Sequence, residues 1–215
     1  MSRPVRVPPI YGFCRGLCRI VMSVWFDFKA YGLDNIPAEG GVLIVSNHES
    51  YLDPIIVGVP VHRPMSFMAK SELFKPFGFG WLIRNLGAFP VNQGKGDRGA
   101  IEETIERLQT GHILNIFPEG ERSLTGELGP VKKGFALVAK RAGVPIVPAI
   151  IEGSYEAWPR SKKSPQSHPV RILYGPPIDV SKMRGDEIVK AVDAAFRKLR
   201  DELASRVAKE VPRFG

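Results

Sequence analysis

Short apolar runs alternate with amphipathic stretches along this chain of 215 residues, and the alternation restricts the fold more than any other feature. Apolar runs predict strands, and apolar residues that recur every three or four positions predict helices. Strands that alternate with helices are typical of an α/β fold with a single mixed, largely parallel sheet and helices on both faces. The predicted strands span 42–45, 65–69, 88–91, 112–117, 144–151 and 170–174, and the predicted helices begin near Asp53, Asp97, Lys132 and Ile188.

Two prolines, Pro145 and Pro148, interrupt one of the predicted strands. Proline has no N–H to donate to a neighbouring strand, so it is confined mainly to sheet edges and bulges. We therefore expect residues 144–151 to form an edge strand or to contain a bulge.

The first 31 residues are expected to form a helical segment that associates with a membrane, ahead of a single domain at residues 32–215. Apolar side chains within residues 10–28 follow one face of a helix, and Arg15 and Arg19 lie away from that face. A basic amphipathic helix with aromatic residues is typical of an interfacial anchor, and a terminal helix packed on the core has the same pattern. Because charges interrupt the apolar run, no transmembrane helix is predicted.

A second candidate membrane contact is the aromatic-rich, glycine-broken stretch at residues 73–84. Its rings and cations suit a bilayer surface, and ordinary packing of a helix on the core is the alternative. The formal net charge of +8 favours acidic partners. Since the sequence has no nucleic-acid-binding motif, we expect an anionic phospholipid membrane surface as a partner and no nucleic acid. The expected location is the cytoplasmic face of the membrane, with the protein peripheral or monotopic.

The two cysteines of the chain, Cys14 and Cys18, lie about one helical turn apart without a histidine nearby. This arrangement is typical of neither a zinc site nor a disulfide framework. We expect two small apolar residues in a reducing cytosol, no metal site and no cofactor. No signal peptide is expected either, because no continuous apolar region follows the basic residues at the start of the chain.

The loop after the strand at residues 42–45 contains the strongest candidates for catalysis, His48 and Asp53. Loops between a strand and a helix are where α/β sheets build their active sites. A carboxylate five residues after a histidine can fold back to one ring nitrogen, fix the tautomer and leave the other nitrogen free to accept a proton. The same spacing also occurs in proteins whose histidine has only a structural role.

Three further blocks accompany this loop along the chain: Phe-Pro-Glu-Gly-Glu-Arg-Ser at residues 117–123, Gly-Ala-Phe-Pro-Val-Asn-Gln at 87–93, and Val-Pro-Ile-Val-Pro-Ala at 144–149. In this order and spacing, the four blocks resemble the glycerolipid acyltransferase family, in particular the 1-acylglycerol-3-phosphate O-acyltransferases, which are also called lysophosphatidic acid acyltransferases. The resemblance extends from about Gly32 to Gly175, so it makes residues 32–215 an acyltransferase catalytic domain.

The resemblance implies transfer of a fatty acyl group to the sn-2 hydroxyl of 1-acylglycerol 3-phosphate, which gives phosphatidic acid in phospholipid biosynthesis. The acyl donor would be acyl-CoA or acyl-carrier protein, acting as a substrate. His48 would be the general base and Asp53 its orienter, in a direct attack on the thioester without a covalent enzyme intermediate. A serine hydrolase is the obvious competitor, but no serine of this chain stands in a Gly-x-Ser-x-Gly elbow.

The resemblance also implies that Glu119, Gly120 and Arg122 help to bind the glycerol phosphate, and that Lys133 approaches the substrate. A glycine permits close approach of the backbone to a ligand, and the planar guanidinium of an arginine matches a phosphate monoester. The alternative for Arg122 is a surface ion pair with Glu121 or Glu127.

One departure from the family pattern is Gln93, where an arginine is often found. Lys95 and Arg98 are near enough in sequence to replace that arginine in substrate binding, and either can equally be a solvated loop charge. The departure leaves another acceptor open: glycerol 3-phosphate, a lyso-ornithine lipid or another lysophospholipid. A third hypothesis is a non-catalytic protein that binds the membrane surface on a degenerate acyltransferase scaffold.

Overall fold

The computed structural model describes residues 8–92 and 97–210. The strands are β1 (Lys29–Tyr31), β2 (Val42–Ser46), β3 (Met65–Lys70), β4 (Ala88–Val91), β5 (Ile113–Ile116), β6 (Ile146–Glu152) and β7 (Arg171–Tyr174). The α-helices are α1 (Pro9–Trp25), α2 (Asp53–Gly58), α3 (Phe79–Asn85), α4 (Arg98–Gln109), α5 (Gly134–Ala142), α6 (Ser154–Ala157) and α7 (Gly185–Val207). Two short 3-10 helices are η1 (Leu33–Asn35) and η2 (Ser71–Phe74).

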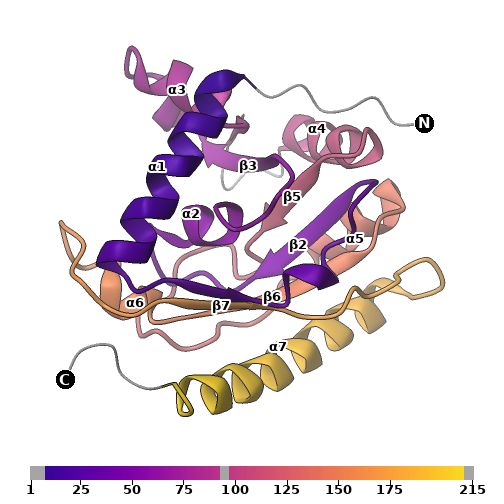
Figure 1. The fold of residues 1–215 in the computed structure, drawn as a ribbon. Helices are drawn as coiled ribbons and strands as arrows, with labels where there is room; N and C mark the ends of the chain where they lie inside the picture. The colour runs from indigo at the N-terminus through magenta and orange to yellow at the C-terminus, as the bar shows by residue number, and fades with distance from the viewer. Residues whose placement is uncertain (1–7, 93–96, 211–215) are drawn as a thin grey trace.

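The strands form one seven-stranded sheet in the order β1-β7-β6-β2-β5-β3-β4 (Figure 1). Strands β2 to β6 all run in one direction, and β7 runs antiparallel to β6 with β1 parallel to β7. The prediction of a single mixed, largely parallel sheet is therefore confirmed. In such a sheet the carboxyl ends of the parallel strands meet at one edge, where α/β proteins bind their ligands.

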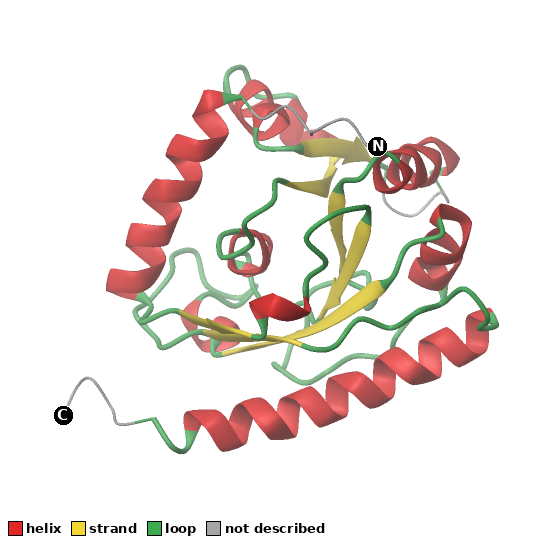
Figure 2. Ribbon diagram, turned by 45° about the vertical axis from the view of Figure 1, so that its right-hand side comes forward, coloured by secondary structure: helices red, strands yellow, loops and turns green. Residues whose placement is uncertain are grey.

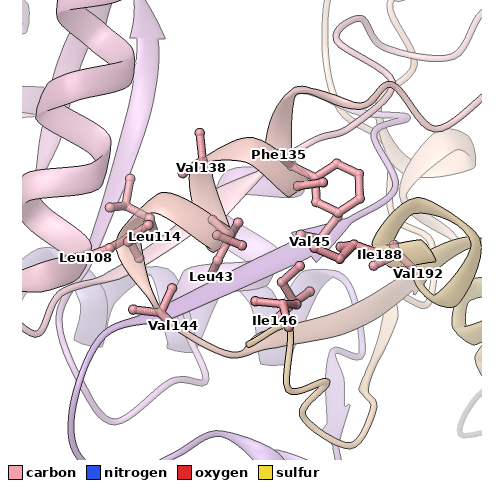
Figure 3. Packing of buried hydrophobic residues seen from close by; sticks show 14 of the residues in the cluster. Leu43, Val45, Leu108, Leu114, Phe135, Val138, Val144, Ile146, Ile188 and Val192 are labelled. Atoms are coloured by element: carbon pink, nitrogen blue, oxygen red, sulfur yellow. The ribbon is translucent and has the colours of Figure 1, made fainter. Parts of the chain in front are cut away.

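Both faces of the sheet are covered, which explains why β2 is a continuous apolar run. Leu43 and Val45 point to one face, where they pack with side chains of α4, α5 and α7 (Figure 3). Val42 and Ile44 point to the other face, toward α1 and α2. All four side chains are fully buried, and each stabilises the fold by about 1.5–3 kcal/mol. Figure 2 shows α1 and α7 on opposite sides of the sheet.

Pro148 lies in an interior strand, so the expectation of an edge strand is wrong. A residue in a strand directs its N–H and its C=O to the same side, and the carbonyl of Pro148 accepts from the N–H of Gly175 at 2.7 Å. The missing N–H therefore faces the point where β7 has just ended at Tyr174. No partner in β7 is deprived of a donor, and the proline is tolerated in the middle of the sheet.

The start of α4 and the end of α5 follow ordinary capping rules. The side chain of Asp97 caps α4 by accepting from the N–H of Ala100 at 3.0 Å, as its position in the sequence predicts. Its other oxygen accepts from the N–H of Asn92, which fixes where α4 begins relative to the end of β4. Helix α5 starts at Gly134, two residues later than predicted, and ends at Ala142, where Gly143 caps it with φ of +67°.

A buried arginine, Arg171, ties the chain after α7 to the antiparallel side of the sheet. Its guanidinium donates to Asp27 and to Glu210, both at 2.7 Å. Lys29 and Tyr31 of β1 also donate to Glu210. Burial opposes the ionisation of Glu210, but hydrogen bonds from these three donors outweigh it and lower its pKa from 4.5 to about 2.

We expect Glu210→Gln to lower the free energy of unfolding at pH 7 by about 1–2 kcal/mol, the range for a partly screened hydrogen bond to a charged group. Because the pKa of Glu210 is depressed in the folded state, its contribution is complete above the unfolded pKa and disappears as the pH falls toward 2. Urea unfolding at pH 7 and pH 3 should show a smaller difference from wild type at pH 3.

The matched control is Glu202→Gln, which removes an exposed pair with Arg206 on α7. This variant should change the urea midpoint little at either pH. An equal loss for Glu210→Gln at both pH values would contradict the assignment of its charge.

Candidate active site

The loops after β2 and β5 lie side by side at the carboxyl edge of the sheet, because these strands pair in parallel with Val45 opposite Ile116. The N–H of Ser123 in the second loop donates to the carbonyl of His48 in the first, at 2.7 Å. Sheet pairing and this hydrogen bond bring residues 47–53 and 117–123 together.

His48 and Asp53 form the hydrogen-bonded pair that their spacing suggests. The Nδ1–H of His48 donates to Oδ2 of Asp53 at 2.8 Å. Asp53 is completely buried at the start of α2, and the same oxygen accepts from the N–H groups of Glu49 and Ser50 at 2.6 and 2.7 Å. The positive end of the helix and these donors suit a carboxylate. The pair fixes the tautomer of the histidine.

The ring of His48 is held flat against Phe117, with centroids 3.9 Å apart and planes inclined by 14°. The side chain is 18% exposed, so it is within reach of a ligand. Within the described residues, Nε2 of the ring has no hydrogen-bond partner. An imidazole with Nδ1 engaged and Nε2 unengaged can accept a proton from a substrate hydroxyl.

Glu119 joins the two loops through their backbones. One carboxylate oxygen accepts from the N–H of His48 at 2.9 Å, and the other accepts from the N–H of Gly129 at 3.1 Å. Burial raises the pKa of Glu119, and these two N–H donors oppose the rise. Both carboxylate oxygens of Glu119 thus accept from backbone N–H groups, and one of these bonds holds the backbone of His48 in place. A contact between Glu119 and the substrate stays a prediction.

A second buried acid, Glu49, lies beside the pair. Burial and the neighbouring charge of Asp53 raise the pKa of Glu49 to about 8, although a hydrogen bond from Asn47 opposes the rise. Asn47 also exchanges hydrogen bonds with the backbone of Ile151 in β6, at 2.8 and 3.0 Å. A protonated Glu49 at pH 7 leaves the negative charge of Asp53 undisturbed. Sequence reasoning missed this residue, because nothing in the spacing marks it as buried.

Arg122 does not form the surface ion pair that was its alternative. Glu121 pairs with Arg160 at 3.8 Å, and Glu127 pairs with Arg200 at 3.2 Å. The guanidinium of Arg122 lies over the ring of Tyr51, with Cζ 3.5 Å from the centroid. Its buried Nη1 has no acceptor among the described residues. A cationic donor without an acceptor is unusual inside a protein and suits an anionic ligand.

Gly120, Lys133 and Arg98 are the other predicted binding residues that the structure describes. Gly120 has φ of +77°, a conformation that glycine adopts at little cost, and a Cβ there would lie 2.8 Å from Nζ of Lys132. Lys132 rather than Lys133 therefore lies against this turn, and Lys133 is exposed at the N-cap of α5. Arg98 is exposed in the first turn of α4. Lys95, like Gln93, lies outside the described residues.

An apolar cavity of about 360 Å³ is lined in part by Pro54 and Ile55, which directly follow Asp53 in α2. It extends between α1, α2, α3 and β3, and its walls include Cys14, Cys18, Gly58, Phe67, Ala69, Leu73, Phe79 and Leu82. Pockets of this size accommodate small organic ligands, and walls of this kind favour an apolar one.

The two helices beside this cavity expose large apolar side chains to solvent. The most exposed are Phe13, Ile20 and Val24 on α1, and Phe77, Phe79 and Trp81 on or just before α3. Met22 alone is buried on α1, so much of its apolar stripe is unpacked. None of the helices in the described part of the chain is long and apolar enough to cross a bilayer.

The family model described as Acyltransferase matches residues 27–152. A 1-acyl-sn-glycerol-3-phosphate acyltransferase of Bacillus subtilis is 29% identical over 202 residues, which cover 92% of this chain and 98% of that protein. One from Streptococcus pneumoniae is 32% identical over 205 residues, covering 89% of this chain and 74% of that protein.

A solved structure is also similar, that of the 1-acyl-sn-glycerophosphate (LPA) acyltransferase PlsC from Thermotoga maritima. The TM-score is 0.77 at 27% sequence identity, and the match covers 90% of this chain and 79% of that one. The chain belongs to the acyltransferase family, together with these 1-acyl-sn-glycerol-3-phosphate acyltransferases.

Proposed function

We propose that this enzyme transfers a fatty acyl group from acyl-CoA or acyl-carrier protein to the sn-2 hydroxyl of 1-acylglycerol 3-phosphate and so produces phosphatidic acid. The observation that carries the proposal is the hydrogen bond of 2.8 Å between His48 and Asp53, with no partner for Nε2 of the imidazole among the residues that the structure describes. The relatives named as acyltransferases for this acceptor support the choice of substrate.

The geometry supports a direct transfer. Nε2 of His48 takes the proton of the acceptor hydroxyl while the oxygen attacks the carbonyl carbon of the thioester. Asp53 stabilises the imidazolium that forms. The tetrahedral intermediate then collapses, the carbon–sulfur bond breaks, and the departing thiolate receives the proton from the imidazolium. A thiolate leaves readily, so no acyl-enzyme is needed.

Arg122 supports recognition of the acceptor phosphate. Its guanidinium has no carboxylate partner among the described residues, and it belongs to the loop that is hydrogen-bonded to His48 through Ser123. A planar guanidinium binds two phosphate oxygens at once. Lys132, Lys133 and Arg98 add positive charge on this side of the molecule, and Lys95 remains a candidate for the same role.

The apolar cavity suits the fatty chain of the donor or acceptor, because its walls are apolar and include Pro54, the residue after Asp53. The exposed apolar side chains of α1 and α3 favour attachment to a membrane surface, where the lipid acceptor resides. The proposed location is peripheral, at the cytoplasmic face of the membrane.

We expect His48→Ala to reduce acceptor-dependent thiol release by about 10²- to 10⁴-fold, the usual contribution of a general base. The measurement is thiol release from an acyl-CoA with 1-acylglycerol 3-phosphate in lipid vesicles. The control is His62→Ala, which removes an exposed imidazole and should leave the rate unchanged. Near-wild-type release by His48→Ala would overturn the mechanism, and wild-type release without acceptor would identify a thioesterase.

We also expect Ala69→Phe to narrow the cavity and to lower kcat/KM for a long-chain acyl-CoA more than for a medium-chain one. Ala69 is on the cavity wall in β3, and a ring there occupies space that a long chain would need. The control is Leu137→Phe, at an exposed position of α5 that does not line the cavity. Equal losses for both donors would show that the acyl chain binds elsewhere.

A further inference from the structure

Tyr51 stands between His48 and Asp53 in the sequence, yet its ring contacts the loop after β5. Cζ of Arg122 lies 3.5 Å from the centroid of this ring, which is stacking distance for a guanidinium. The ring also contacts Trp158, with centroids 5.2 Å apart and planes inclined by 43°. Three side chains from three separate segments thus pack together next to the catalytic pair.

The backbone at Trp158 is fastened to the loop that carries His48. The Oγ–H of Ser50 donates to the carbonyl of Trp158 at 2.8 Å, and Ser50 forms an isolated bridge with Pro159. The indole N–H of Trp158 donates to the carbonyl of Lys162 at 3.1 Å. Trp158 is therefore held through both its backbone carbonyl and its indole N–H. Its indole in turn supports the ring of Tyr51.

The side chain of Arg122 must be held in one conformation before it can bind a phosphate tightly. An arginine side chain has many rotamers, and ordering it on binding reduces affinity unless something orders it beforehand. Carboxylates usually perform this task, but Glu121 and Glu127 are paired with Arg160 and Arg200. A carboxylate partner would also compete with a phosphate for the guanidinium. An aromatic face orients the guanidinium and leaves its in-plane N–H groups for the ligand.

We infer that Tyr51, supported by Trp158, is a positioning residue that holds Arg122 ready for the phosphate of the acceptor. The inference rests on the proposed function, in which Arg122 binds that phosphate. The face of the ring performs the task, since no hydrogen bond of the Tyr51 hydroxyl is formed within residues 8–92 and 97–210. Another aromatic residue therefore suffices at this position, whereas an aliphatic residue does not.

The test compares Tyr51→Leu with the conservative variant Tyr51→Phe. In Tyr51→Leu, we expect KM for 1-acylglycerol 3-phosphate to rise about 3- to 30-fold, with kcat and the KM for acyl-CoA nearly unchanged. In Tyr51→Phe, all three constants should stay near wild type. A general structural defect would instead lower kcat and alter the donor KM. A wild-type acceptor KM in Tyr51→Leu would overturn the inference.

A double-mutant cycle with Arg122→Ala isolates the pair. In the Arg122→Ala background, Tyr51→Leu should raise the acceptor KM no further, because the side chain that Tyr51 positions is gone. Additive effects of the two substitutions would overturn the inference.

Equilibrium binding separates this inference from the proposed function. Calorimetry with 1-acylglycerol 3-phosphate and with 1-acylglycerol should show weaker binding to Tyr51→Leu only for the phosphorylated lipid. Wild-type binding that does not depend on the phosphate would overturn the inference. Phosphate-dependent binding that Tyr51→Leu weakens, but without acyl transfer by the wild type, would support the inference and overturn the proposed function.

Discussion

The parallel pairing of β2 with β5 is the constraint on which the site depends. It places the loop that carries the catalytic pair beside the loop that carries Arg122, although about 70 residues separate them in sequence. Two polar links then fix the loops: the carboxylate of Glu119 between two backbone N–H groups, and the hydrogen bond from the N–H of Ser123 to the carbonyl of His48. The position of the histidine thus depends on pairing between strands that are far apart in the sequence.

The acidic side chains around the site differ in charge and in hydrogen-bond partners. Of the three buried acids, Glu49 has a pKa of about 8, Glu119 is occupied by backbone donors, and Asp53 faces the imidazole. The nearby glutamates of the second loop are paired with other arginines, which leaves Arg122 without a carboxylate in the described part of the chain. Asp53 thus serves the proton transfer, and Arg122 is available to an anionic substrate.

Sequence reasoning predicted most of the fold, because β2 is a continuous apolar run and Asp97 stands where a cap is needed. It failed at Pro148, since the rule for prolines does not reveal where the adjacent strand ends. The pair of His48 and Asp53 was predictable from local spacing. The partners of Arg122 were not, because Trp158 follows β6 and reaches the site only through the fold.

Gly129 contributes to the site although it lies outside the sequence motifs that mark the site. Its N–H holds one oxygen of Glu119, and a Cβ at this position would lie 2.8 Å from that same oxygen. A side chain there requires the carboxylate of Glu119 to shift, and this carboxylate also accepts the N–H of His48. Gly129 lies in none of the four sequence blocks, yet a substitution 81 positions away from the histidine acts on the carboxylate that holds the backbone of His48.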